Sequence, residues 1–167
     1  MEKPKVIIVD DNDVPIGLKY RQEMDPEKDN YRCSGIWITN NKAEVLLAQR
    51  KFTKTHDPGK WGPAAAGTLE EGDTYESNAY QELSEELGIT GITLTVGPAQ
   101  RVLTPHRFFC RWYFCEITKD AAEFAIQEDE VEQVLWIGEE ELRADVAKNP
   151  QNYIASFPEA IELLLQP

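Results

Sequence analysis

The segment between Gly67 and Ile89 constrains this chain more than any other part of the sequence, because it combines a turn, a helix and a cluster of acidic side chains. Asp73 or Thr74 can cap the exposed N–H groups of a first helical turn. Gly88 can adopt the left-handed conformation that ends a helix. The pattern therefore predicts a helix over about residues 74–87.

Two sets of side chains divide the surface of this predicted helix. An apolar stripe has four-residue spacing and consists of Ala79, Leu83 and Leu87. Three carboxylates at positions i, i+3 and i+4 fall within an arc of about 100°, and they belong to Glu82, Glu85 and Glu86. Like charges at this spacing repel each other. Bound Mg²⁺ or Mn²⁺ would relieve the repulsion, since both ions prefer oxygen ligands. The alternative is a solvated acidic face.

The same segment resembles the Nudix box, in which a glycine precedes a helix carrying the sequence Arg-Glu-aliphatic-x-Glu-Glu-x-Gly. The matching residues are Gly67, Glu82, Leu83, Glu85, Glu86, Gly88 and Ile89. Two positions depart from the pattern, because Asp73 replaces the usual Glu and Gln81 replaces the usual Arg. The resemblance implies glutamates that hold divalent ions against a diphosphate, one of them also serving as the base for the attacking water. Such ions neutralise phosphoryl charge and acidify bound water.

Composition limits the remaining possibilities. At 167 residues the chain is long enough for one domain with a proper core. Its 17 basic and 30 acidic residues give a net charge of −13, which argues against long nucleic acid but not against a small phosphorylated substrate held through a metal. The sequence contains neither a membrane-spanning run nor a signal segment, and its three cysteines favour free thiols in a cytoplasmic protein.

Strand and helix signals alternate irregularly along the chain. This order predicts an α/β fold with a mixed β-sheet covered by helices on both faces, and the resemblance implies the Nudix α/β/α sandwich. Residues 1–30 are expected to form an N-terminal β-hairpin and a connector, and residues 31–167 the Nudix core of a single domain. The predicted strands are 6–9, 14–18, 33–39, 45–49, 92–96, 101–103, 108–117 and 131–137, and helices are predicted at 139–148 and 158–165.

Several runs resemble the isopentenyl-diphosphate isomerase branch of the family, including Ala48-Gln-Arg-Lys51 and Pro58-Gly-Lys-Trp61. The resemblance implies that Arg50 and Lys54 bind the substrate diphosphate, with Gly67 beside them. An Arg fork suits paired phosphate oxygens and Lys acts as a point charge.

The residues needed for isomerase chemistry are absent. The catalytic Cys of the isomerases corresponds to Ala66, and two metal-binding His positions correspond to Tyr31 and Thr68. The chain therefore resembles hydrolase relatives of the isomerases. A late acidic residue near the metals is expected at Glu130 or Glu128.

The combined interpretation is a Mg²⁺- or Mn²⁺-dependent hydrolase that cleaves a nucleoside diphosphate derivative or another small organic diphosphate. Two alternatives remain open: an isoprenoid diphosphate isomerase, and a binding module that kept the fold without catalysis. Because dimers are frequent in the family, a homodimer is also possible.

Overall fold

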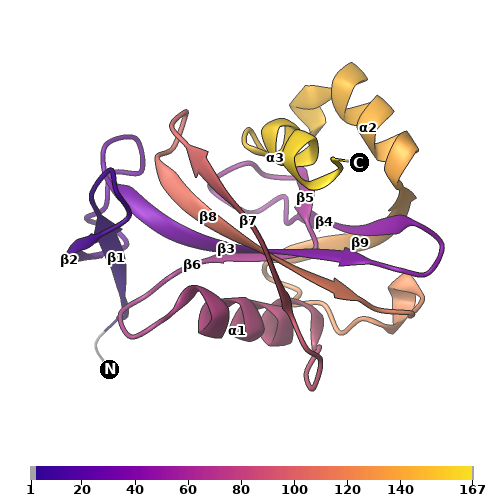
Figure 1. The fold of residues 1–167 in the computed structure, drawn as a ribbon, viewed down its shortest axis with the longest axis horizontal. Helices are drawn as coiled ribbons and strands as arrows, with labels where there is room; N and C mark the ends of the chain where they lie inside the picture. The colour runs from indigo at the N-terminus through magenta and orange to yellow at the C-terminus, as the bar shows by residue number, and fades with distance from the viewer. Residues whose placement is uncertain (1–2, 167) are drawn as a thin grey trace.

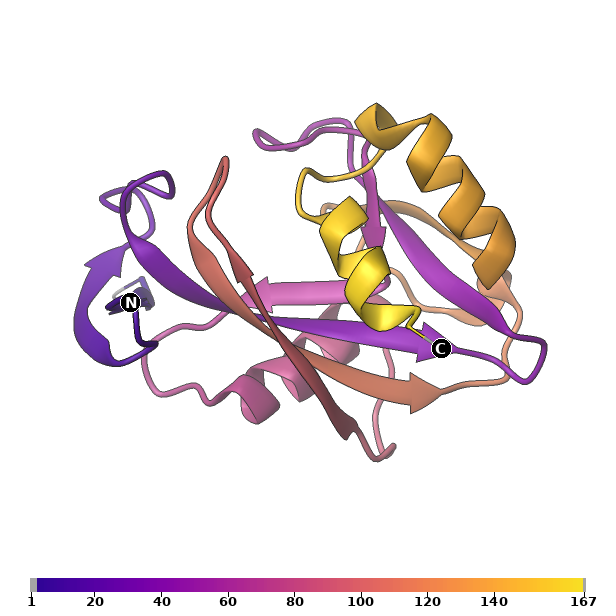
Figure 2. The same ribbon diagram turned by 45° about the horizontal axis from the view of Figure 1, so that its top comes forward.

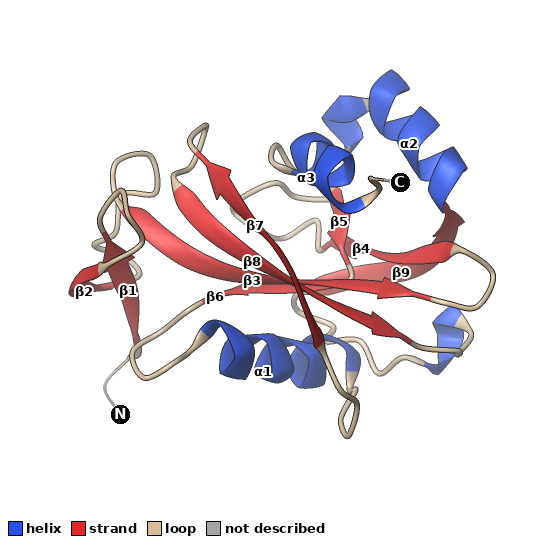
Figure 3. Cartoon of the chain, in the orientation of Figure 1, coloured by secondary structure: helices blue, strands red, loops and turns tan. Residues whose placement is uncertain are grey.

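A computed structural model of the chain describes residues 3–166, and in this range a mixed sheet of nine strands lies between helices on its two faces (Figures 1 and 3). Helix α1 (Tyr75–Leu87) covers one face. Helices α2 (Glu139–Lys148) and α3 (Phe157–Leu164) cover the other, as the tilted view in Figure 2 also shows. The predicted fold class is confirmed.

Strand β3 (Asn30–Thr39) is the spine of the sheet, because it pairs with four other strands. It runs parallel to β8 and antiparallel to β1, β4 and β6. Strand β4 also pairs with β5 and β9, and β7 pairs with β8. The other strands are β1 (Lys5–Val9), β2 (Pro15–Tyr20), β4 (Glu44–Arg50), β5 (Trp61–Pro63), β6 (Ala65–Thr68), β7 (Thr95–Val102), β8 (Phe108–Glu116) and β9 (Val131–Gly138).

Helix α1 begins and ends at the residues that its local sequence indicates. Thr74 is the N-cap and accepts a hydrogen bond from the backbone N–H of Ser77, whose hydroxyl accepts one from Thr74 in return. Gly88 ends the helix in the left-handed region at φ 66°. Between these ends, the predicted apolar stripe is completely buried: Ala79, Leu83 and Leu87.

Alternation along β3 separates the two largest hydrophobic clusters, one on each face of the sheet. Ile36 and Ile38 face α1 and pack with its apolar stripe. Trp37 points to the opposite face, where it packs with Leu142 of α2 and Phe157 of α3. The period of two in a strand explains this division, because successive side chains point to opposite faces.

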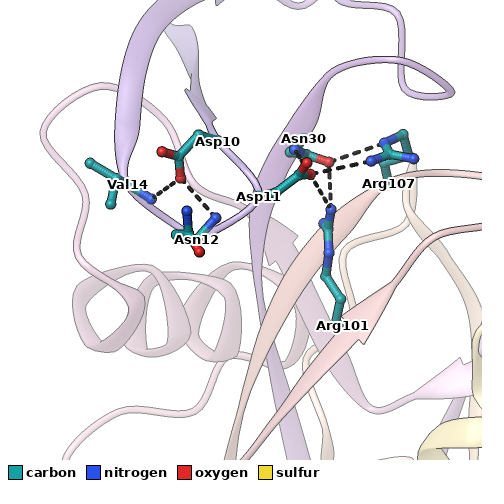
Figure 4. A network of polar contacts seen from close by, with 7 residues as sticks. All are labelled: Asp10, Asp11, Asn12, Val14, Asn30, Arg101 and Arg107. Atoms are coloured by element: carbon teal, nitrogen blue, oxygen red, sulfur yellow. Dashed lines mark hydrogen bonds and ion pairs between the residues drawn. The ribbon is translucent and has the colours of Figure 1, made fainter.

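The predicted N-terminal hairpin is confirmed, since β1 and β2 pair antiparallel. Polar and charged side chains connect its turn to other parts of the molecule (Figure 4). Asp10 closes the turn by accepting two backbone N–H groups. Asp11 accepts hydrogen bonds from Asn30, Arg101 and Arg107, at 2.9, 3.2 and 3.3 Å. Both arginines also donate to the side-chain amide oxygen Oδ1 of Asn30. The hairpin is thereby joined to β3, to β7 and to the loop that precedes β8.

Two details of the predicted strands were wrong. The strands expected at 92–96 and 101–103 form one continuous strand, β7, with an irregularity in register between Val96 and Ala99. Gly97 and Pro98 interrupt the apolar pattern at that irregularity, where a strand tolerates both residues. The segment 53–63, expected to be loop, contains β5 at its end, and β6 follows. No helix within residues 3–166 is long and apolar enough to cross a membrane.

Candidate active site

Seven side chains or backbone positions that the sequence nominates for the site line one cleft of about 700 Å³, whereas Glu128, the alternative to Glu130, is not among the lining residues. They come from β4 and the loop after it, from β6, from α1 and from the loop before β9. They are Arg50, Lys54, Gly67, Glu82, Glu85, Glu86 and Glu130.

Glu82 is the carboxylate of α1 that lies against strand β6. A side chain at Gly67 would overlap the Glu82 side chain, so Glu82 could not keep this position against β6 if residue 67 carried a Cβ atom. Asn78, one turn earlier on α1, donates to Glu82 at 3.4 Å and is itself buried. Burial, followed by the charge of Glu85, raises the pKa of Glu82 to about 7.

Glu86 is held by the strand backbone. Its carboxylate accepts a hydrogen bond of 3.1 Å from the N–H of Ala66. This bond favours the ionised form, but burial and the neighbouring charge of Glu82 outweigh it and raise the pKa of Glu86 to about 8. Helix α1 therefore presents two neighbouring carboxyl groups, those of Glu82 and Glu86, without enough positive charge nearby to offset their repulsion.

Glu85 lies on the exposed side of the same arc, and Gln81 contacts it. The Gln81 amide donates to the Glu85 carboxylate at 3.0 Å. Gln81 thus orients a glutamate of the box by a hydrogen bond, without the charge that the more usual arginine would bring.

Arg50 stands at the end of β4, where the pairing with β9 shifts register between Gln49 and Arg50. Such irregularities re-aim side chains at the edges of sheets. The guanidinium donates from Nε to the carbonyl oxygen of His56 at 3.0 Å. The loop after β4 therefore holds Arg50 at the rim of the cleft.

Lys54 and Glu130 meet across the cleft, with the Lys54 Nζ atom 2.6 Å from Glu130 Oε2. The loop that carries Glu130 is anchored to helix α1, because Gln127 donates its backbone N–H to the carbonyl oxygen of Glu86 at 3.1 Å. The charge of Glu130 contributes to the raised pKa of both Glu82 and Glu86, so it belongs to the same electrostatic cluster.

The donor chemistry fits a hard divalent cation. Seven acidic side chains line the cleft, and a cation would offset their repulsion. Two of them, Glu82 and Glu86, have a raised pKa. Within residues 3–166, no three acidic, His or Cys side chains already converge as a closed set of ligands. The carboxylates would therefore have to draw together around an ion.

Other residues of the cleft were missed or only partly anticipated. Asn78 is the clearest omission, and its signal is a polar residue four positions before Glu82 on the same helix face. His106, considered as a possible substrate contact, lies edge-on to His56 with ring centroids 5.7 Å apart, and both line the cleft. All three cysteines are free thiols, as expected.

Comparison with known proteins agrees with this geometry. The sequence profile of the NUDIX domain matches residues 30–157. The chain belongs to the Nudix family. The match indicates an enzyme that hydrolyses acid anhydride bonds of the pyrophosphate type.

Curated relatives connect this Nudix protein to both hydrolases and isomerases. An uncharacterised Nudix hydrolase of Yersinia pestis is 29% identical over 146 residues, covering 83% of this chain and 75% of the relative. Isopentenyl-diphosphate Delta-isomerase 2 of Photorhabdus laumondii is 27% identical over 158 residues, covering 93% and 89%. The resemblance to the isomerase-like branch is thus confirmed.

Solved structures share the Nudix fold. The structure of DR0079 from Deinococcus radiodurans superposes with a TM-score of 0.86 at 17% identity and covers 97% of this chain and 99% of its own. The NUDIX domain of Shewanella oneidensis NrtR, solved with ADP-ribose, gives a TM-score of 0.61 at 19% identity, covering 87% and 94%. At these identities the likeness concerns the fold.

Proposed function

We propose that this Nudix protein is a Mg²⁺- or Mn²⁺-dependent hydrolase that cleaves the diphosphate bond of a small nucleoside diphosphate derivative or another organic diphosphate. The observation that carries the proposal is the meeting of four carboxylates with Arg50 and Lys54 in one cleft. Acidic side chains supply ligands for the cation, and the two basic residues supply charge for the diphosphate.

The roles of the residues follow from their surroundings. Glu82, Glu85 and Glu86 would hold the divalent ions, which when bound neutralise charge on the phosphoryl oxygens and acidify water. Arg50 and Lys54 steady the diphosphate. Water attacks phosphorus, and one of the glutamates, or Glu130 at the end of its loop, accepts the proton.

Ala66 favours hydrolysis over isomerisation. The resemblance to the isomerases places it where they carry their catalytic Cys, and a methyl group cannot transfer a proton. Its backbone N–H is used instead to hold Glu86. An assay with isopentenyl diphosphate in heavy water tests this choice, because incorporation of deuterium into the product would favour the isomerase alternative.

The central experiment combines a substrate screen with one double variant. Purified protein is incubated with nucleotide and isoprenoid diphosphates in the presence of Mg²⁺ or Mn²⁺, and the phosphomonoester products and any free phosphate are separated and measured by chromatography. The variant with both Glu85→Gln and Glu86→Gln should lose metal-dependent turnover, whereas Glu140→Gln on the exposed surface of α2 should retain it. Full activity in the double variant would reject the assignment. Metal and ligand binding without any turnover would favour the non-catalytic module.

The other expectations concern the setting of the enzyme. We infer a cytoplasmic protein that acts on small phosphorylated molecules and does not bind long nucleic acid, since the net charge of −13 opposes phosphate contacts over an extended surface. A homodimer is proposed as well, and light scattering coupled to size-exclusion chromatography measures it directly.

A further inference from the structure

Lys54 and Glu130 are candidates for two different ligands, yet they contact each other. The 2.6 Å ion pair joins the loop after β4 to the loop before β9. Both side chains are only partly exposed, at 27% and 34%, and both line the cleft. While this pair persists, the Lys54 ammonium group contacts a carboxylate and not a phosphate. Glu130 in turn is paired with the single positive charge of Lys54 and not with a divalent cation.

The backbone around the pair is fixed, so a change of partner is a matter of side-chain rotation. The N–H of Glu130 donates to the Gln127 carbonyl oxygen at 3.0 Å, and its carbonyl oxygen accepts from the N–H of Lys51 at 3.0 Å. The N–H of Lys54 in turn donates to the Lys51 carbonyl oxygen at 3.1 Å. Lys54 and Glu130 are thereby presented to the same cleft from two tied loops.

We propose that Lys54 and Glu130 exchange partners when the cleft is loaded: Lys54 neutralises Glu130 in the empty cleft, and then turns to the diphosphate while Glu130 turns to the divalent cation. The inference rests on the proposed function. A divalent ion attracts a carboxylate more strongly than an ammonium does at equal distance, and a diphosphate offers Lys54 an anion of higher charge. Neither side chain is left without a counter-charge in either state.

The exchange predicts that removing the Lys54 ammonium group changes metal affinity and diphosphate affinity in opposite directions. A lysine that only binds phosphate would affect diphosphate affinity alone. Without substrate, Lys54 competes with the cation for Glu130, so removal of the ammonium should strengthen metal binding. With the cation bound, Lys54 contributes to the diphosphate site, so the same removal should weaken ligand binding. The two bound ligands therefore support each other, as linkage requires.

The chain provides a matched control in the same two segments. Lys51 pairs with Glu132 at 3.2 Å, and the two side chains are 30% and 34% exposed. This pair has nearly the same burial as Lys54 and Glu130 and the same combination of charges. Unlike them, Lys51 and Glu132 are not among the residues that line the cleft.

The experiment measures Mn²⁺ binding to the full chain by titration calorimetry, without substrate. The Lys54→Gln variant should bind Mn²⁺ roughly two- to fivefold more tightly, which is the range expected for a partly exposed ion pair. The Lys51→Gln variant should match the wild type. In a Glu130→Gln background, the Lys54→Gln substitution should have almost no effect on the affinity for Mn²⁺, because the shared carboxylate has gone.

A second titration uses methylenediphosphonate at saturating Mn²⁺, and here Lys54→Gln should weaken binding relative to both wild type and Lys51→Gln. Unchanged or weaker Mn²⁺ binding in Lys54→Gln overturns the exchange. An equal gain in Mn²⁺ affinity from Lys54→Gln with and without Glu130 also overturns it. The gain would then come from removing a positive charge near the cation, and not from freeing Glu130. Circular dichroism confirms folding, and Lys54→Met gives an independent variant. If the wild type binds no Mn²⁺, the proposed function fails instead, so the two failures are distinguishable.

Discussion

Glu86 should make the metal-free protein less stable as pH rises, and Glu86→Gln should remove this dependence. The carboxyl group is half-buried beside Glu82, and burial is the main cause of its raised pKa. Ionisation in the folded state is therefore unfavourable, whereas in the unfolded chain the same group ionises freely. A glutamine keeps the shape and can still accept the hydrogen bond from Ala66 without carrying a charge.

The magnitude follows from the two pKa values. The folded pKa of Glu86, about 8, lies above its ordinary value of 4.5. The stabilisation is therefore fully present below pH 4.5 and is lost as pH rises through about 8. At about 1.4 kcal/mol per pH unit, the ceiling for this loss is about 5 kcal/mol. Solvent access and coupling to Glu82 reduce the expected value to about 2 to 3 kcal/mol.

The assay is urea unfolding in the presence of a chelator, at about pH 5 and about pH 8. Between these conditions the wild type should lose about 2 to 3 kcal/mol more than Glu86→Gln does. Glu140→Gln, on the exposed surface of α2, should behave as the wild type. Addition of Mn²⁺ should stabilise the wild type more at the higher pH, because the cation binds the ionised form. Equal pH dependence in wild type and Glu86→Gln would refute the reasoning.

Three further substitutions test individual contacts of the site. Gly67→Ala should displace the Glu82 carboxyl group and weaken Mn²⁺ binding in calorimetry; normal Mn²⁺ affinity would contradict a role for this close contact in the cation site. Gln81→Arg should raise kcat several-fold by giving Glu85 a charged partner, and an unchanged rate would show that the hydrogen bond already suffices. Tyr75→Phe removes a 3.0 Å hydrogen bond from α1 to a hairpin carboxylate. It should lower the free energy of unfolding in urea by about 1 to 2 kcal/mol, and an unchanged value would contradict a stabilising role for this contact.

Helix α1 could be predicted from the sequence because all its determinants are local. The cap at Thr74, the apolar stripe and the stop at Gly88 lie within one short segment, and each acts through neighbouring residues. The hairpins and the mixed sheet were predictable for a similar reason, since turn residues and alternating apolar residues specify them. The structure has α1 as Tyr75–Leu87, inside the predicted range of 74–87.

Features that depend on distant residues could not be read in this way. Strand β6 is short and rich in Ala and Gly, and it becomes a strand by pairing with β3. Its composition alone carries little strand propensity. The contact of Lys54 with Glu130 joins residues 76 positions apart. Sequence reasoning nominated both residues but gave them separate ligands, because pairing between loops is decided only when the sheet brings the loops together.

The balance of charge in the cleft implies an order of binding. Seven acidic side chains line the cleft against three Arg or Lys side chains, Arg21, Arg50 and Lys54, and Lys54 is already engaged by Glu130. Before a cation is bound, a diphosphate would meet a net negative site in a protein of charge −13. A bound divalent ion reverses the local charge and, through Glu130, releases Lys54 for the phosphate. Cation binding should therefore precede diphosphate binding, and methylenediphosphonate should show little affinity for the chelator-treated protein. Tight binding of that ligand without a cation would mean that Arg50 and Lys54 are available from the start.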